Sequence, residues 1–99
     1  MAAVNDSFVG KATLANNATA TIQPASGHEV ALHYVFAVGA GELYLTDGTD
    51  EVLIATTSTG NVWFGGSVRL TNGDYAYYKN KSGASQKVKW SGVYTKVPA

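Results

Sequence analysis

Apolar and polar residues alternate along much of the chain, most regularly between Glu29 and Val38. The alternation has a period of two, which is the spacing at which side chains of a β-strand return to the same face. It therefore predicts a strand over Glu29–Val38. One face of this strand is expected to be strongly apolar and to comprise Val30, Leu32, Tyr34, Phe36 and Val38.

Turn-forming residues recur roughly every ten positions and divide the chain into short segments. Asp47-Gly48 and Asn72-Gly73 are strong signals for tight hairpins. No window sustains the apolar spacing of an amphipathic helix. The expected strands are Phe8–Leu14, Ala18–Gln23, Glu29–Val38, Glu42–Thr46, Glu51–Thr56, a segment from Val62 to Leu70, Tyr75–Lys79 and Gln86–Val97.

The same alternation assigns a direction to most side chains. After the first hairpin, Val52 and Ile54 are expected to face the core. Gly65-Gly66 lies inside the sixth segment and predicts a bulge or bend, because glycines within strands mark such points. Tyr44 and Trp63 fall on faces that point away from the core.

About eight antiparallel strands in 99 residues predict an all-β fold, a single small β-sandwich. A jelly roll is one sandwich of this kind, but a single sequence leaves the strand order open. The domain is expected to cover residues 8–97. Residues 1–7, in which nothing alternates, are expected to form a short N-terminal arm.

The net charge and the number of charged residues argue against some classes of binding partner. Seven Lys and Arg balance seven Asp and Glu, so the formal net charge is zero. This balance argues against nucleic-acid binding through phosphates and against a polybasic membrane-surface role. Charged residues make up 14% of the chain, whereas about 25% is usual in soluble domains. Such a low charge content favours self-association or a protein partner.

Candidate chemistry is sparse. The chain has no cysteine. His28 and His33 are five positions apart, and an odd spacing places two residues on opposite faces of a strand. Asp47 and Asp50 offer oxygen ligands for calcium, but their spacing misses the EF-hand pattern and is typical of a turn. No catalytic motif is present. We therefore expect no enzyme activity, no metal and no cofactor.

The outward aromatic residues are more informative. Exposed Trp and Tyr are enriched at protein–protein interfaces and at sugar-binding surfaces, and a covering loop is a third explanation. We predict an interface that includes Tyr44, Trp63, Arg69 and Tyr78, since at least one tyrosine of the run 75–78 must point outward. A carbohydrate-binding module is the alternative, with Asp47, Asp50 or Asn72 bonding sugar hydroxyls.

Five of the seven positive charges follow residue 78, whereas the acids lie mostly before Asp74. This separation of charge is typical of a solvated strand edge. It also suits the steering of one copy onto another, or onto an acidic lattice. The five residues are Lys79, Lys81, Lys87, Lys89 and Lys96.

The segment from Ala20 to Leu70, about half the chain, resembles small β-sandwich accessory proteins of tailed-bacteriophage virions. The resemblance lies in an I-x-P-x-x-G entry (Ile22–Gly27) before a long apolar strand, and in an x-L-x-D-G-T hairpin (Tyr44–Thr49) after it. It implies a non-enzymatic structural protein, most simply a capsid decoration (cement) protein.

The resemblance further implies homo-oligomers, often trimers, that bind the major capsid protein or another virion protein. The location implied is the capsid surface, after synthesis in the host cytoplasm. Decoration proteins often carry an extended arm, and the arm expected here is at most about seven residues. A tail or neck accessory protein therefore remains an alternative placement.

Overall fold

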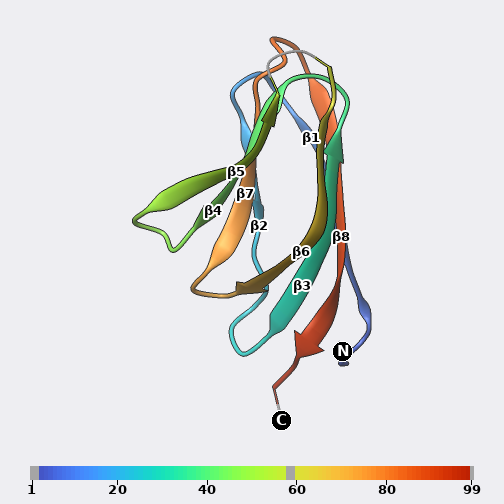
Figure 1. Cartoon of the computed structure of the whole chain (residues 1–99), viewed down its shortest axis with the longest axis vertical. Helices are drawn as coiled ribbons and strands as arrows, with labels where there is room; N and C mark the ends of the chain where they lie inside the picture. The colour runs from blue at the N-terminus through green and yellow to red at the C-terminus, as the bar shows by residue number, and fades with distance from the viewer. Residues whose placement is uncertain (1–2, 58–59, 99) are drawn as a thin grey trace.

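A computed structural model describes residues 3–57 and 60–98. Throughout these residues the ordered elements are β-strands, eight in number, arranged in two four-stranded antiparallel sheets (Figure 1). The two sheets pack against each other, which confirms the expected all-β sandwich. Among the described residues, no helix is long and apolar enough to cross a membrane.

The strand boundaries agree with those expected to within about two residues. The strands are β1 (Ser7–Leu14), β2 (Thr19–Ile22), β3 (Glu29–Ala37), β4 (Gly41–Thr46), β5 (Glu51–Thr57), β6 (Val62–Thr71), β7 (Tyr75–Asn80) and β8 (Gln86–Lys96).

The strand order is nested. One sheet has the order β1-β8-β3-β6 and the other the order β2-β7-β4-β5. The first strand thus pairs with the last, the second with the seventh, the third with the sixth and the fourth with the fifth. Successive pairs in this series belong to alternate sheets. Residues near the start of the chain, on β1, therefore lie beside residues near its end, on β8.

The core lies between the inner faces of the two sheets. Its largest fully buried side chain is that of Tyr78, and the rest of the core is aliphatic. Such burial of apolar surface is the main stabilising term of a small domain. The buried apolar residues are Leu14, Ala20, Ile22, Val30, Leu32, Val35, Ala37, Leu43, Val62, Leu70, Ala76, Tyr78 and Val88.

A bulge in β3 changes which of its residues face the core, so the expected face is wrong for the second half of the strand. Val30 and Leu32 are buried as expected, but the register with both neighbouring strands shifts between Leu32 and Tyr34. Opposite β8 the extra residue is His33, and it reverses the alternation of β3, because a one-residue slip moves every later side chain to the other face. Opposite β6 the extra residue lies on β6, where Gly66 and Ser67 stand opposite His33 alone, in agreement with the bulge or bend predicted at Gly65-Gly66. Tyr34, Phe36 and Val38 are therefore exposed, and Val35 and Ala37 take their places in the core.

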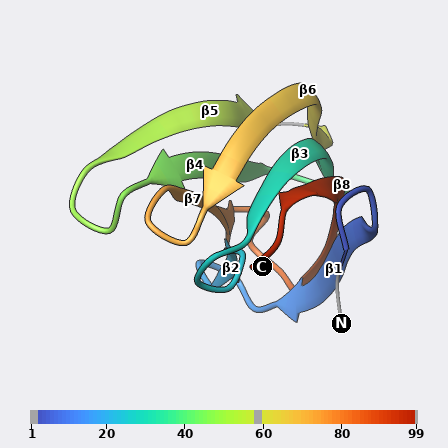
Figure 2. The ribbon, with the colours of Figure 1, turned by 90° about the horizontal axis from the view of Figure 1, so that it is seen from below.

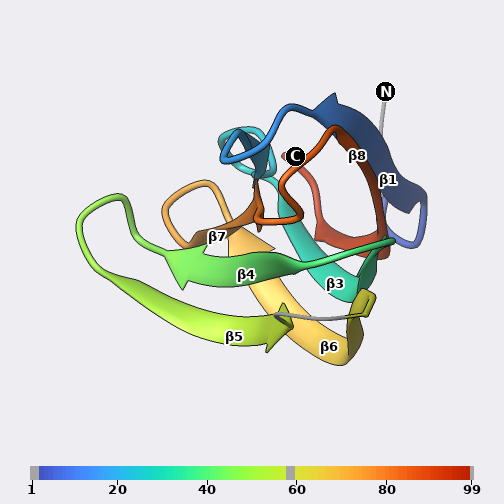
Figure 3. The same cartoon turned by 90° about the horizontal axis from the view of Figure 1, so that it is seen from above.

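The β4–β5 hairpin also departs from expectation. Its ladder shifts register between Leu43 and Tyr44, where Ile54 is the extra residue on β5. The hairpin extends sideways beyond the rest of the sandwich (Figures 1, 2 and 3). Val52 was expected in the core but is 64% exposed, because the opposite sheet does not reach this part of the hairpin. Ile54, nearer the body, packs against the core as expected.

The residues before β1 are tied to the last strand. The backbone N–H of Asn5 donates to the Tyr94 carbonyl at 2.8 Å, and the Tyr94 N–H donates to the Asp6 carbonyl at 2.9 Å. The described residues 3–6 thus form a hydrogen-bonded turn that continues the pairing of β1 with β8. Residues 1 and 2 of the expected arm lie outside the described residues.

Candidate functional site

The outer face of the β1-β8-β3-β6 sheet carries a cluster of exposed apolar side chains. The register places Lys11, Lys89, Phe36 and Trp63 in one row across the four strands. We call this surface the aromatic face and define it by Val9, Lys11, Tyr34, Phe36, Val38, Trp63, Lys87 and Lys89.

Trp63 is the most prominent member of the aromatic face. Its side chain is 66% exposed, as the sequence predicted. The indole lies along β6 over Gly65, where a Cβ would come within 2.6 Å of the ring atom Cη2. Glycine at position 65 therefore leaves room for the ring over the strand. Phe36, which is also exposed, stands opposite Trp63 on β3. A large exposed aromatic surface of this kind is typical of an interaction site.

A shallow hollow of about 430 Å³ lies on the same face. Its wall is formed by Val9 and Tyr34, and the stems of Lys11 and Lys89 border it. The Trp90 ring underlies Gly10, where any Cβ would overlap it. The hollow is thus lined by apolar and aromatic residues together with two lysines.

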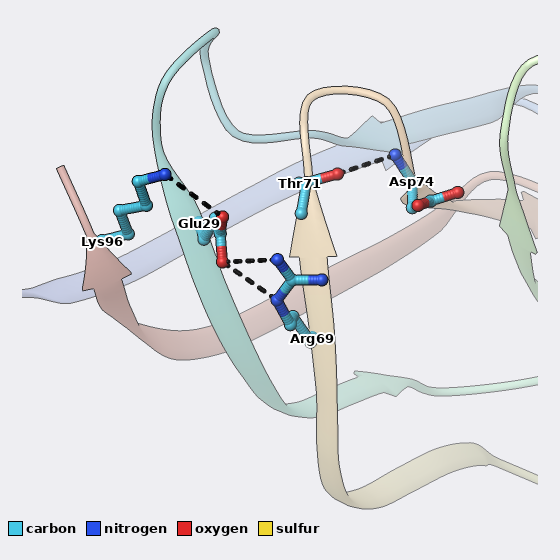
Figure 4. A network of polar contacts seen from close by, with 5 residues as sticks. All are labelled: Glu29, Arg69, Thr71, Asp74 and Lys96. Carbon is cyan, nitrogen blue, oxygen red and sulfur yellow. Dashed lines mark hydrogen bonds and ion pairs between the residues drawn. The ribbon is translucent and has the colours of Figure 1, made fainter. Parts of the chain in front are cut away.

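Arg69 lies on the same sheet, on the other side of the bulge (Figure 4). Its guanidinium donates from Nε to Glu29 Oε1 at 2.9 Å, and Nη2 lies 2.8 Å from the same oxygen. Lys96 Nζ is 3.8 Å from the other carboxylate oxygen. Because this ion pair is largely exposed, we expect it to contribute about 1 kcal/mol or less. The predicted interface residue Arg69 therefore already has a partner.

The outer face of the other sheet carries a polar cluster. Tyr44 on β4 stacks on Tyr77 on β7, with ring centroids 4.9 Å apart and planes 13° apart. The Tyr44 hydroxyl donates to Glu42 at 3.0 Å, and the Tyr77 hydroxyl donates to Glu51. We call these four residues the tyrosine–glutamate cluster. Beside it is a depression of about 320 Å³ lined by Thr19, Thr21, Thr46, Gly48, Thr49, Glu51, Tyr75 and Tyr77.

The pKa of Tyr77 is raised to about 12, first by burial and then by its hydrogen bond to Glu51. We expect Glu51→Gln to lower this pKa toward the ordinary value of 10, because the carboxylate no longer favours the protonated phenol. The measurement is a spectrophotometric titration of phenolate absorbance, with Tyr77→Phe identifying the transition.

The matched control is Glu29→Gln, which removes a carboxylate from the opposite sheet and should leave the titration unchanged. Because the pKa in the folded state exceeds that in the unfolded chain, this tyrosine stabilises the fold below pH 10. That contribution is lost as the pH rises from 10 to about 12. An unchanged Tyr77 titration in Glu51→Gln would contradict the assignment.

Tyr78 is a correction to the predicted interface. Its side chain is fully buried, and its hydroxyl donates to Gln86 Oε1 at 2.8 Å. It alternates with Tyr77 along β7, so Tyr77 points outward and Tyr78 points into the core. Of the four predicted residues, the structure leaves Tyr44, Trp63 and Arg69 at the surface, but on different sheets or separated by the bulge.

The candidate metal ligands have local partners. Nδ1 of His28 lies 3.3 Å from the Ser26 carbonyl, and Nδ1 of His33 lies 3.3 Å from the Gly66 carbonyl. Asp47 Oδ1 accepts the backbone N–H groups of Thr49 and Asp50, which holds the Asp47 pKa below its usual value. Within the described ranges, no group of three or more His, Asp or Glu could hold a metal ion.

Sequence reasoning missed several members of the aromatic face. Alternation alone predicts Tyr34 and Phe36 in the core, because β3 itself carries no glycine that marks the irregularity at His33. It predicts no face for Val9. Two signals bear on the change of face: the polar residue His33 within an apolar run, and Gly65-Gly66 on the neighbouring strand, which predicts a bulge beside it.

Comparisons with known proteins define the fold only. No protein-family model matches the sequence, and no curated protein shows significant similarity to it. The nucleoplasmin-like N-terminal domain of Drosophila FKBP39 superposes with a TM-score of 0.52 at 12% identity, covering 88% of this chain and 89% of that domain.

Two pentameric capsid proteins isolated from metagenomic phage sequences are also structural neighbours. One superposes with a TM-score of 0.48 at 18% identity, covering 89% of this chain and 67% of that one. The other gives 0.46 at 16% identity, covering 89% of this chain and 61% of that one.

Proposed function

We propose that this protein is a non-enzymatic structural protein of a bacteriophage virion, a capsid decoration protein that self-associates and binds the head lattice. The observation that carries the proposal is the aromatic face. On this small chain, Trp63, Phe36 and Tyr34 are exposed on neighbouring strands of one sheet. A protein partner that covers them removes this apolar surface from water, which favours binding.

Two further features support the proposal. The nested strand order, with β1 beside β8 and β2 beside β7, supports a jelly-roll arrangement of the two four-stranded sheets. The entry and hairpin motifs at Ile22–Gly27 and Tyr44–Thr49 resemble those of phage accessory proteins. Repetition of one weak contact over a lattice would raise its overall strength by multivalency.

The test is sedimentation of the source lysate through a density gradient, with each fraction probed for this chain. We expect the chain to migrate with intact particles, and its copy number per major capsid subunit to distinguish a decoration protein from a tail or neck protein. A chain that stays at the top of the gradient would overturn the virion role.

Trp63→Ala is expected to reduce the fraction that migrates with particles, since it removes the largest exposed ring of the aromatic face. The control is Val4→Ala, which truncates an apolar residue that is 50% exposed in the turn before β1. Equal particle binding by both variants and the unaltered protein would contradict the role of the aromatic face.

The tyrosine–glutamate cluster favours a second candidate function, binding of a carbohydrate. Stacked tyrosines present ring faces to sugar C–H groups, and the adjacent threonines and Glu51 offer donors and acceptors for hydroxyls. Asp47, one of the residues expected in this role, accepts two backbone N–H groups of its own turn through Oδ1. We expect a glycan panel to give Tyr77-dependent binding if this function is present. Silence across a broad panel would remove it.

A further inference from the structure

Charge is divided between the two sheets. The β1-β8-β3-β6 sheet carries five cations, Lys11, Arg69, Lys87, Lys89 and Lys96, and one carboxylate, Glu29, for a net charge of +4. The other sheet, counted with its β4–β5 turn, carries four carboxylates, Glu42, Asp47, Asp50 and Glu51, and one cation, Lys79. Its net charge is −3, so this neutral molecule has a positive face and a negative face.

The lysines of the aromatic face have no acidic partner among the described residues. Across residues 3–57 and 60–98, the ion pairs are those of Glu29 with Arg69 and Lys96. Lys11 and Lys89 stand directly opposite each other on β1 and β8. Like charges in this position are destabilising, and a carboxylate supplied from outside would relieve the repulsion.

The β4–β5 hairpin offers the complementary chemistry. It extends beyond the sandwich (Figures 2 and 3), and Val52 and Leu53 are exposed on it. Asp50 and Glu51 immediately precede these apolar residues. We call residues 47–53 the acidic hairpin. The acidic hairpin therefore carries apolar residues next to carboxylates, whereas the hollow of the aromatic face is lined by Val9 and Tyr34 together with Lys11 and Lys89.

We propose that copies of this chain associate head to tail, with the acidic hairpin of one copy seated on the aromatic face of the next. The proposal specifies the self-association contained in the proposed function. Pairing of two aromatic faces would bring lysines against lysines, whereas head-to-tail contact brings opposite charges together. Such a heterologous contact closes into a ring or continues as a filament.

A specific interface buries about 800 Å² on each partner. That is about one seventh of the 5497 Å² accessible surface of the chain. Val52 would enter the hollow beside Val9 and Tyr34, as an apolar anchor does at other interfaces.

The test is sedimentation velocity of the purified full chain at low and high salt. We expect oligomers at low salt that dissociate as salt screens the charges. Lys89→Glu and Asp50→Lys should each weaken association about a hundredfold, because each places like charges at the contact. Lys81→Glu, the same change in a loop outside both surfaces, is the control. Urea unfolding of each variant checks that the fold is intact.

Mixing the two variants provides a second measurement. Lys89→Glu and Asp50→Lys, combined in equal amounts, should restore oligomers, because each contact between different variants has opposite charges. If Lys89→Glu instead strengthens association, two aromatic faces pair and the head-to-tail contact is wrong. Monomers at every protein concentration would overturn it as well. Migration with particles would then still support the virion role, so the two proposals fail separately.

Discussion

Gly92→Ala is expected to lower the free energy of unfolding by about 3 kcal/mol or more, as severe overpacking does. Gly92 lies on β8 opposite Leu32, and a Cβ there would overlap the carbonyl oxygen of Ala31. The obstacle is backbone rather than a flexible side chain, so relief requires β3 and β8 to separate beside the bulge. The measurement is urea unfolding followed by tryptophan fluorescence.

Gly73→Ala is the matched control. A Cβ at position 73, in the turn between β6 and β7, meets no atom within 4 Å. Alanine there restricts the unfolded chain, and we expect stability to stay the same or rise by up to about 1 kcal/mol. Similar stabilities for the two variants would show that β3 and β8 do not approach each other this closely.

Asn80→Ala is expected to destabilise the protein by about 3 kcal/mol. Asn80 is fully buried at the end of β7. Its Nδ2 donates to the Leu14 carbonyl at 2.9 Å and to the Ala84 carbonyl at 2.7 Å, and its Oδ1 accepts the Ser82 N–H at 2.8 Å. Alanine leaves these groups without partners, and each buried unpaired group costs about 1–3 kcal/mol.

Asn16→Ala provides the comparison. Asn16 is exposed, and its Oδ1 accepts the Gly83 N–H at 3.0 Å from the neighbouring loop. Water can replace this bond, so we expect a loss of less than about 1 kcal/mol. The measurement is the free energy of unfolding of both variants by chemical denaturation, and we expect the larger loss at the buried Asn80. Equal losses would contradict the structural role assigned to Asn80.

The alternation of apolar and polar residues predicts only part of the aromatic face. Trp63 could be placed outward because the alternation in β6 is regular from Val62 to Phe64. Tyr34 and Phe36 could not, because their direction depends on a bulge that forms against two neighbouring strands. Tyr78 shows the reverse error, since its run of three tyrosines gave no indication of which ring would enter the core.

The separation of charge was visible along the chain, but its meaning was not. The sequence indicated that lysines gather after residue 78 and acids before Asp74. Lys11 escaped that pattern, and the pairing of β1 with β8 then placed it opposite Lys89. Glu42 and Glu51 came together on the other sheet through the β4–β5 hairpin and their hydrogen bonds to Tyr44 and Tyr77.

Local alternation and turn residues were sufficient to predict the eight strands, their approximate limits and the two-sheet class, because these signals act over a few residues. The strand order, the irregularity at His33 and the extension of the β4–β5 hairpin beyond the core appear only in the structure. These features depend on contacts between segments far apart in the chain. The aromatic face and the acidic hairpin arise from them, and so they emerge only in the folded molecule.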